Sequence, residues 1–297
     1  MRKSNSLIVS IFIIILVGAL AYSVVTCGGD GSTATTTTGI TTTITTTITT
    51  AATVTVSPLD ASQEVQSACT YLGSNYNTSV GLIAETPSHT RYFLYSDNFL
   101  AALAMPRGCP IPPHSRIPIY ENINSTLSKY NSSQIPNQFM VFQCKWYFQG
   151  SHDYDLSGDI WTTVNNQTGL PLNASAYADV AFLQAYYDVT CLHNIPAAIT
   201  VYNTGADMYN GVGFNDTPFQ IGQSKGIYQT YKLAFYIYTA ILLNQTVPLS
   251  ALVNMARMQA PNGGFYTGYD DGFSNDNTST NTETTCLAIM ALRALFR

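Results

Sequence analysis

The sequence contains few charged residues. Lys, Arg, Asp and Glu make up 10% of its 297 residues, against about 25% in an average soluble domain. The 12 Lys and Arg residues are scattered singly and are outnumbered by 17 Asp and Glu residues, so no basic stripe is present to neutralise phosphates. Because 46% of the residues are hydrophobic, the chain is not a disordered acidic tail. We therefore expect a globular body with an uncharged polar surface and no nucleic-acid partner.

The motifs of several enzyme classes are also missing. The four histidines form no HExxH motif and no i, i+4 pair, so a zinc protease has no support. The sequence contains no GxSxG, Walker or GxGxxG motif either. His152-Asp153-Tyr154-Asp155 is a dense polar cluster, for which a solvated loop is the simpler interpretation.

The N-terminus carries the longest apolar segment. Residues 7–26 are uncharged and follow Arg2 and Lys3, and their length fits either a long signal peptide or an uncleaved membrane span. Lipid attachment at Cys27 is a third alternative. Because basic residues stay on the cytoplasmic side, residues 28 onward are predicted to lie outside the cell, either secreted or anchored to the membrane through residues 7–26.

A Thr-rich tract follows the apolar segment. Residues 33–55 contain no charge and read TATTTTGITTTITTTITTAATVT, a composition typical of O-glycosylated stalks. An unglycosylated linker is the alternative. The predicted organisation is therefore a signal peptide or anchor over residues 1–26, a disordered stalk over 27–57 and a folded extracellular domain over 58–297.

The body carries eight N-x-Ser/Thr sequons, which fit an exported glycoprotein; they lie at Asn77, Asn124, Asn131, Asn166, Asn173, Asn215, Asn244 and Asn277. A surface with few ionisable groups changes little in charge in acid. We therefore hypothesise an acidic external habitat, such as that of a thermoacidophilic archaeon.

The body has five cysteines without zinc-site spacing: Cys69, Cys109, Cys144, Cys191 and Cys286. In an oxidising exterior they predict two disulfides and one thiol, whereas five small buried hydrophobes are the alternative. The pairing is not readable from sequence.

The body repeats one pattern, in which a glycine corner and a polar loop precede an apolar helix. The corners are Gly81-Leu82, Gly213-Phe214 and Gly264-Phe265, and such recurrence indicates a repeat architecture. Helical periodicity predicts helices over residues 62–76, 96–105, 119–130, 174–191, 197–209, 226–243, 249–259 and 282–296. Residues 139–149 look like a short β segment instead.

The last copy carries a family resemblance. Gln259, Gly263-Gly264-Phe265, Thr282-Glu283-Thr284-Thr285 and Leu287-Ala288 resemble the α/α toroids of six-hairpin glycosidases and of terpenoid cyclase or prenyltransferase relatives. The resemblance implies a mainly α fold, a small or incomplete α/α toroid of helical hairpins. An irregular helical bundle is the alternative. The DxDD acid and the zinc ligands of the cyclase and prenyltransferase branch are absent, which disfavours that branch.

Parallel inner helices would bring their N-termini and the preceding loops to one rim. Only four glutamates occur in the chain, and two of them fall at corresponding corners or helix starts. A protonated and an ionised carboxyl together hydrolyse glycosidic bonds, and the resemblance implies this use. The candidate catalytic residues are Glu85 or Asp97 as one acid and Asp270, Asp271 or Glu283 as the other.

Tyrosines on the same loops and helix starts would supply surfaces that stack on sugars; they are Tyr92, Tyr95, Tyr228, Tyr266 and Tyr269. A purely structural alternative exists for the acids. Asp97 and Glu283 stand where carboxylates cap a helix or favour its dipole. Asp270 and Asp271 fit a turn, or a weak Ca²⁺ site together with Asp276. No other cofactor is expected.

These patterns leave three functional hypotheses. The first is a cell-surface or secreted enzyme that acts on polysaccharide, as a glycoside hydrolase or a lyase. The second is a non-catalytic module that binds glycans, peptides or an envelope protein, and the third is a structural role in the envelope. The sequence does not indicate the substrate or the oligomeric state.

Overall fold

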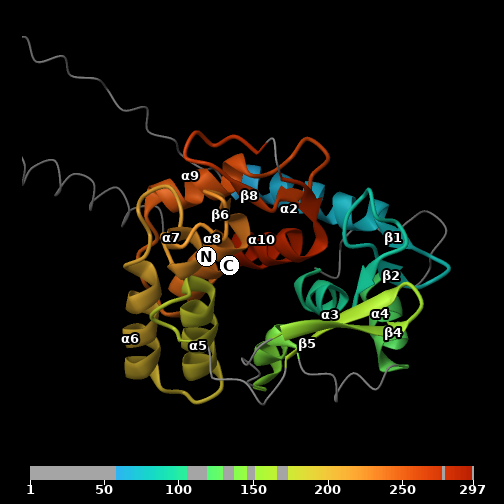
Figure 1. Ribbon diagram of the computed structural model, residues 1–297, viewed down its shortest axis with the longest axis horizontal. Helices are drawn as coiled ribbons and strands as arrows, with labels where there is room; N and C mark the ends of the chain where they lie inside the picture. The colour runs from blue at the N-terminus through green and yellow to red at the C-terminus, as the bar shows by residue number, and fades with distance from the viewer. Residues whose placement is uncertain are drawn as a thin grey trace, which may run out of the picture. The chain divides into compact units, whose positions relative to one another are not determined.

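The computed structural model describes residues 58–105, 119–129, 137–145, 151–165, 173–275 and 278–295. It is mainly helical, with 55% helix and 10% strand, which confirms the predicted class (Figure 1). The helices are α2 (Pro58–Ser74), α3 (Tyr95–Ala104), α4 (Ile119–Ser128), α5 (Ala178–Thr190), α6 (Ile195–Ala206), α7 (Thr217–Gln220), α8 (Thr230–Leu242), α9 (Leu249–Arg257) and α10 (Thr282–Leu295).

The strands are short and belong to small sheets. Three antiparallel pairs join β1 (Tyr76–Asn77) to β2 (Leu82–Ile83), β6 (Tyr228–Gln229) to β8 (Gly268–Tyr269), and β7 (Phe265–Tyr266) to β9 (Thr280–Asn281). The three-stranded sheet has the order β3 (Phe93–Leu94), β5 (Ile160–Asn165), β4 (Ser151–Ser157), with β3 parallel to β5. The two-residue pairs hold together the loops that precede the helices.

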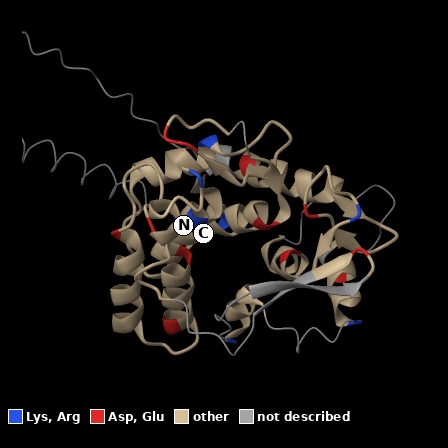
Figure 2. Cartoon of the chain, viewed as in Figure 1, with Lys and Arg blue, Asp and Glu red and all other residues tan. Residues whose placement is uncertain are grey.

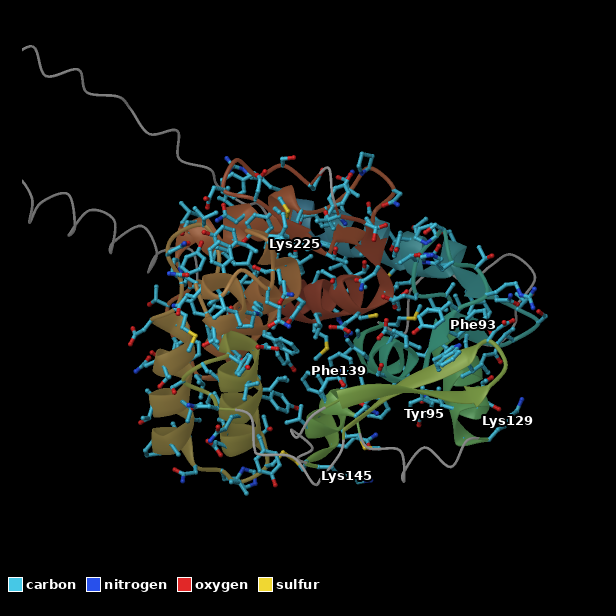
Figure 3. All side chains as sticks on the ribbon, viewed as in Figure 1. Phe93, Tyr95, Lys129, Phe139, Lys145 and Lys225 are labelled. Carbon is cyan, nitrogen blue, oxygen red and sulfur yellow. A yellow bond between two sulfur atoms is a disulfide. The ribbon has the colours of Figure 1, made fainter. Side chains whose placement is uncertain are left out.

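The predicted β segment at residues 139–149 is wrong for residues 139–145, and residues 146–149 lie outside the described residues. The structure has a 3₁₀ helix, η2 (Gln138–Gln143), which begins because the Asn137 side chain accepts a hydrogen bond from the Phe139 backbone N–H. Phe139, Met140 and Val141 are all buried, whereas a strand sends successive side chains to opposite faces. Phe139 lies inside the molecule (Figure 3). The strands of this region are β4 and β5 instead.

Four helices pack side by side in an order that differs from the order in the chain. α10 packs between α3 and α8, and α8 in turn packs against α5. η2 contacts both α3 and α5. Each of the four helices also has a partner on its other side: α4 on α3, α2 on α10, α9 on α8, and α6 on α5. As predicted for a helix that is apolar nearly all round, α8 is buried over most of its length.

Hydrogen bonds donated by backbone N–H groups align the N-termini of these helices. The first residue of α10, Thr282, donates its N–H to the Glu85 carbonyl oxygen at 2.9 Å, and the first residue of α8, Thr230, donates to the Thr267 carbonyl at 3.0 Å. The first residue of α5, Ala178, donates to Asp216 Oδ2 at 3.2 Å. Each bond joins a helix start to the corner loop that leads into its neighbour, so these N-terminal ends lie together.

Two of the three glycine corners pack against tyrosine rings. A Cβ atom on Gly213 would overlap the Tyr228 ring, and one on Gly264 would lie 2.6 Å from the Tyr71 ring. Only a glycine allows this approach of the backbone. At the first corner, a Cβ atom on Gly81 would instead lie 2.5 Å from Thr126 Oγ1.

A disulfide joins Cys144, at the end of η2, to Cys191, at the end of α5, and Cys69 is disulfide-bonded as well. Cys286 is a buried free thiol. The prediction of disulfides is thus confirmed for Cys144 and Cys191. The predicted signal or anchor and the stalk lie outside the described residues, and within the described residues no helix is long and apolar enough to span a membrane.

Candidate functional site

Three carboxyl groups from the N-terminal and C-terminal parts of the folded body meet at the aligned helix starts. Glu85 lies in the loop after β2, Asp97 in the first turn of α3 and Glu283 in the first turn of α10. Figure 2 shows how few positions of the chain carry Asp, Glu, Lys or Arg. Glu85 acts electrostatically on both Asp97 and Glu283. The backbone bond from Thr282 to the Glu85 carbonyl brings the two segments together.

Asp97 is the most deeply buried of the three, with 1% of its surface exposed. Burial raises the pKa of its carboxyl well above the usual range, and the charge of Glu85 and a hydrogen bond to Glu85 raise the pKa further. Its Oδ1 accepts a hydrogen bond from Ser96 Oγ at 3.3 Å. The second oxygens of the two carboxyl groups, Asp97 Oδ2 and Glu85 Oε2, are buried, and no hydroxyl, amide or backbone N–H group of the described residues donates to them. A proton on Asp97, donated to Glu85, satisfies both oxygens.

Glu283 also favours its protonated form. Burial raises the pKa of its carboxyl to about 8, and the charges of Glu85 and Asp179 contribute. Glu283 lies at the start of α10, where the helix dipole favours a negative charge, so burial outweighs the dipole here. At neutral pH this side chain holds a proton that it can donate.

A pocket of about 420 Å³ gives ligands access to Glu283. This volume lies within the range of about 300–1,000 Å³ that is typical of small-molecule sites. The pocket is lined by Ser224, Ile227, Gln229, Tyr231, Thr267, Gly268, Thr278, Asn281, Glu283 and Thr284. Its walls are the starts of α8 and α10 and the loops that the β6–β8 pair joins.

Asn281 connects the helix start to the carboxyl cluster. Its Oδ1 accepts a hydrogen bond from the Thr284 N–H at 2.9 Å, which makes Asn281 the N-cap of α10. Its Nδ2 donates to Glu85 Oε1 at 3.0 Å. The capping role that was open for Glu283 therefore belongs to Asn281, and the side chain of Asp97 likewise does not cap α3.

A second polar group lies at the starts of α5 and α8. Tyr231 donates its hydroxyl to Asp179 Oδ2 at 3.3 Å, and burial raises the pKa of both side chains. Lys232 forms a buried ion pair with Asp216 at 2.6 Å. Sequence reasoning did not assign Tyr231 or Lys232 to the site. Their positions in the first turn of a repeated helix are the feature of the sequence that could have identified them.

Asp270 and Asp271 do not join the carboxyl cluster. Asp270 Oδ1 accepts the N–H groups of Gly272 and Ser274 at 2.9 and 2.8 Å, which is the geometry of a turn, and Asp271 is exposed. Asp270 therefore has the role in a turn that was the alternative to a catalytic role. No metal-binding group of His, Cys, Asp and Glu side chains occurs in the described ranges, and Asp276 of the calcium hypothesis lies outside them.

The five candidate tyrosines have different environments. Tyr95, Tyr228 and Tyr269 are buried, and Tyr269 donates its hydroxyl to the Val212 carbonyl at 2.7 Å. We assign these three to the core, because a buried ring presents no face to a sugar. Tyr92 and Tyr266 are half-buried, and the Tyr92 ring lies 6.2 Å from that of Trp161.

No protein-family model, curated protein or solved structure matches this chain. The functional argument therefore depends on the site itself, a set of buried carboxyl groups beside a pocket on a mainly α scaffold.

Proposed function

We propose that the protein is a glycoside hydrolase that acts on polysaccharide outside the cell. The observation that carries the proposal is Glu283, a pocket-lining carboxyl whose pKa burial raises to about 8, next to a second carboxyl, Glu85. A protonated carboxylic acid and an ionised carboxylate are the two groups that glycoside hydrolysis requires.

The roles follow from the environments of the side chains. Glu283 is the general acid, which protonates the leaving glycosidic oxygen as the bond to the anomeric carbon breaks. Glu85 accepts hydrogen bonds from Asn281 and from Asp97 and serves as the second carboxylate from behind the pocket lining, where its negative charge stabilises the positive charge that develops at the anomeric carbon. A water molecule adds its hydroxyl to the anomeric carbon, and its proton restores the acid. Asp97 and Asn281 position Glu85.

The packing order of the helices supports the finer fold proposal. α3, α10, α8 and α5 form a continuous row, and η2 contacts both α3 and α5 at the ends of that row. We propose that this arrangement is a small α/α toroid in which η2 replaces an inner helix. In such a toroid the carboxyl cluster lies at the rim formed by the helix N-termini.

A lyase has less support from the same region. A tyrosine base needs an accessible phenolate, whereas burial and nearby carboxylates raise the pKa of Tyr231 well above its usual range. A lyase also needs a cation beside its acidic substrate, and Arg91 is paired with Asp159 at 3.2 Å and does not line the pocket.

The proposed location outside the cell has independent support. The disulfide between Cys144 and Cys191 fits an oxidising compartment, as do the sequons and the apolar N-terminal segment of the sequence. Anchoring through residues 7–26 and a glycosylated stalk remain predictions.

The test is release of reducing ends from a panel of polysaccharides by the full-length protein. We expect release by the wild type and a loss of at least about 100-fold in Glu283→Gln, because general acid catalysis contributes about 10²–10⁴-fold. The matched control is Glu121→Gln, a glutamate on the exposed face of α4, which should keep full activity. Release that is unchanged in Glu283→Gln would overturn the assignment.

A non-catalytic glycan-binding module is the second candidate. The hydroxyl and amide side chains of the pocket favour it, because they bind sugars without any chemistry. Thermal stabilisation by an oligosaccharide without release of reducing ends would identify this function instead.

A further inference from the structure

The pocket beside Glu283 is polar yet almost uncharged. Its lining contains five hydroxyl groups, from Ser224, Tyr231, Thr267, Thr278 and Thr284, and two amides, from Gln229 and Asn281. Glu283 is the ionisable carboxyl among the lining residues. The side chains of Tyr231, Thr278 and Asn281 already bond to protein groups, whereas Ser224 Oγ has no hydrogen-bond partner among the described residues. Hydroxyls and amides both donate and accept hydrogen bonds, so Ser224, Thr267 and Gln229 match the hydroxyl groups of an uncharged sugar.

No lysine or arginine is among the described residues that line this pocket. Lys232, on the neighbouring turn of α8, is 5% exposed and held by Asp216 at 2.6 Å. Lys225, labelled in Figure 3, is an exposed neighbour of Ser224 on the preceding loop and is not part of the lining. An anionic ligand would therefore meet no cationic side chain in the described lining of the pocket, and the N-terminal dipoles of α8 and α10 would offer it only a partial positive charge.

The side chains directly behind the pocket lining include two carboxyl groups. Asn281 Nδ2 lies 3.0 Å from Glu85 Oε1, and the Tyr231 hydroxyl lies 3.3 Å from Asp179 Oδ2. A carboxylate or sulfate on the ligand would lose its hydration and also be repelled by these carboxyl groups. Specificity often arises from such repulsion as much as from attraction.

We infer that this pocket selects an uncharged glycan segment and rejects sugars that carry carboxylate or sulfate groups. The inference rests on the proposed function, since it names the substrate class of the same site.

The first experiment measures binding by titration calorimetry with full-length Glu283→Gln, which keeps the shape of the protonated acid and does not consume the ligand. The probes are linear tetramers of glucose, mannose and xylose and a tetramer of galacturonic acid. We expect the best neutral tetramer to bind at least about tenfold more tightly than the galacturonate tetramer, with an affinity that salt does not change. Tighter binding of the galacturonate tetramer would overturn the inference.

The second experiment reverses the selectivity. Thr267 contributes its side chain to the pocket, while its backbone N–H and carbonyl bond to Ser279 and Thr230. Thr267→Arg should raise the affinity for the galacturonate tetramer at least about tenfold. The control is Thr200→Arg, on the exposed face of α6, which should leave it unchanged.

An unchanged galacturonate affinity in folded Thr267→Arg would overturn the assignment of this pocket. If that variant does not fold, Gln229→Lys places the charge on β6, where Gln229 pairs with Gly268, and tests the same expectation.

The outcomes separate the inference from the proposed function. Release of reducing ends combined with equal affinity for neutral and galacturonate tetramers would overturn the inference and leave the hydrolase standing. Selective binding of a neutral tetramer without release by the wild type would overturn the hydrolase and support the inference.

Discussion

Replacing Glu283 with glutamine should make the stability of the protein less dependent on pH. The pKa of Glu283 rises from 4.5 to about 8 on folding, chiefly through burial. Between these values the folded protein binds more protons than the unfolded chain, so the free energy of unfolding falls as the pH rises. The stability is fully present below about pH 4.5 and is lost as the pH passes about 8.

The magnitude follows from the same pKa values. The rise from 4.5 to about 8 corresponds to about 5 kcal/mol as an upper limit. Because the side chain is partly open to the pocket, solvent screening reduces this to about 2–4 kcal/mol. Glu283→Gln keeps the shape of the side chain and removes its charge. The difference in free energy of unfolding between wild type and variant should therefore change by about 2–4 kcal/mol between about pH 4.5 and about pH 8.

The assay is urea unfolding of the full-length protein, with its disulfides intact, at a series of pH values from about 4 to 9. Glu121→Gln, on the exposed surface of α4, is the control and should follow the wild type. The reasoning is refuted if wild-type stability rises from pH 5 to pH 8, or if Glu283→Gln has the same pH dependence as the wild type.

Three further predictions concern stability. Cys144→Ser with Cys191→Ser opens a loop whose ends are 47 residues apart and should lower the free energy of unfolding by about 4 kcal/mol; an unchanged urea midpoint would contradict this. Lys232→Met leaves Asp216 buried without its cation and should cost about 3–5 kcal/mol, whereas the double variant with Asp216→Asn should recover part of the loss, as a double-mutant cycle would measure. Asn281→Ala removes the cap of α10 and should lower stability by about 1 kcal/mol and also lower kcat, since Glu85 loses a hydrogen bond; a loss of stability with unchanged kcat would limit Asn281 to capping.

Sequence patterns were sufficient for the longer helices but did not predict the short α7. The periodicity of residues 282–296 predicted α10 (Thr282–Leu295) to within one residue, because apolar spacing of 3.6 residues follows from the geometry of a buried helix. The segment at residues 139–149 failed for a physical reason. A short apolar run fits either a strand or a helix, and the cap by Asn137 together with burial of three successive side chains decided for η2.

The candidate site was predictable only in part. The scarcity of glutamate drew attention to Glu85 and Glu283, which the structure places in one cluster with Asp97. Asp270 stood at a corresponding corner, yet its carboxylate accepts local backbone N–H groups. A local turn and a pocket wall have the same polar composition, so sequence does not separate them.

The sequence by itself determined the helical class, the glycine corners and the shortage of charge, because these depend on periodicity and composition. Only the tertiary structure decided which acids meet, that Asn281 rather than Glu283 caps α10, and that the pocket is lined by neutral groups. The reason is that burial and the approach of segments about 200 residues apart set the protonation of a carboxyl group, and neither quantity is a property of the local sequence.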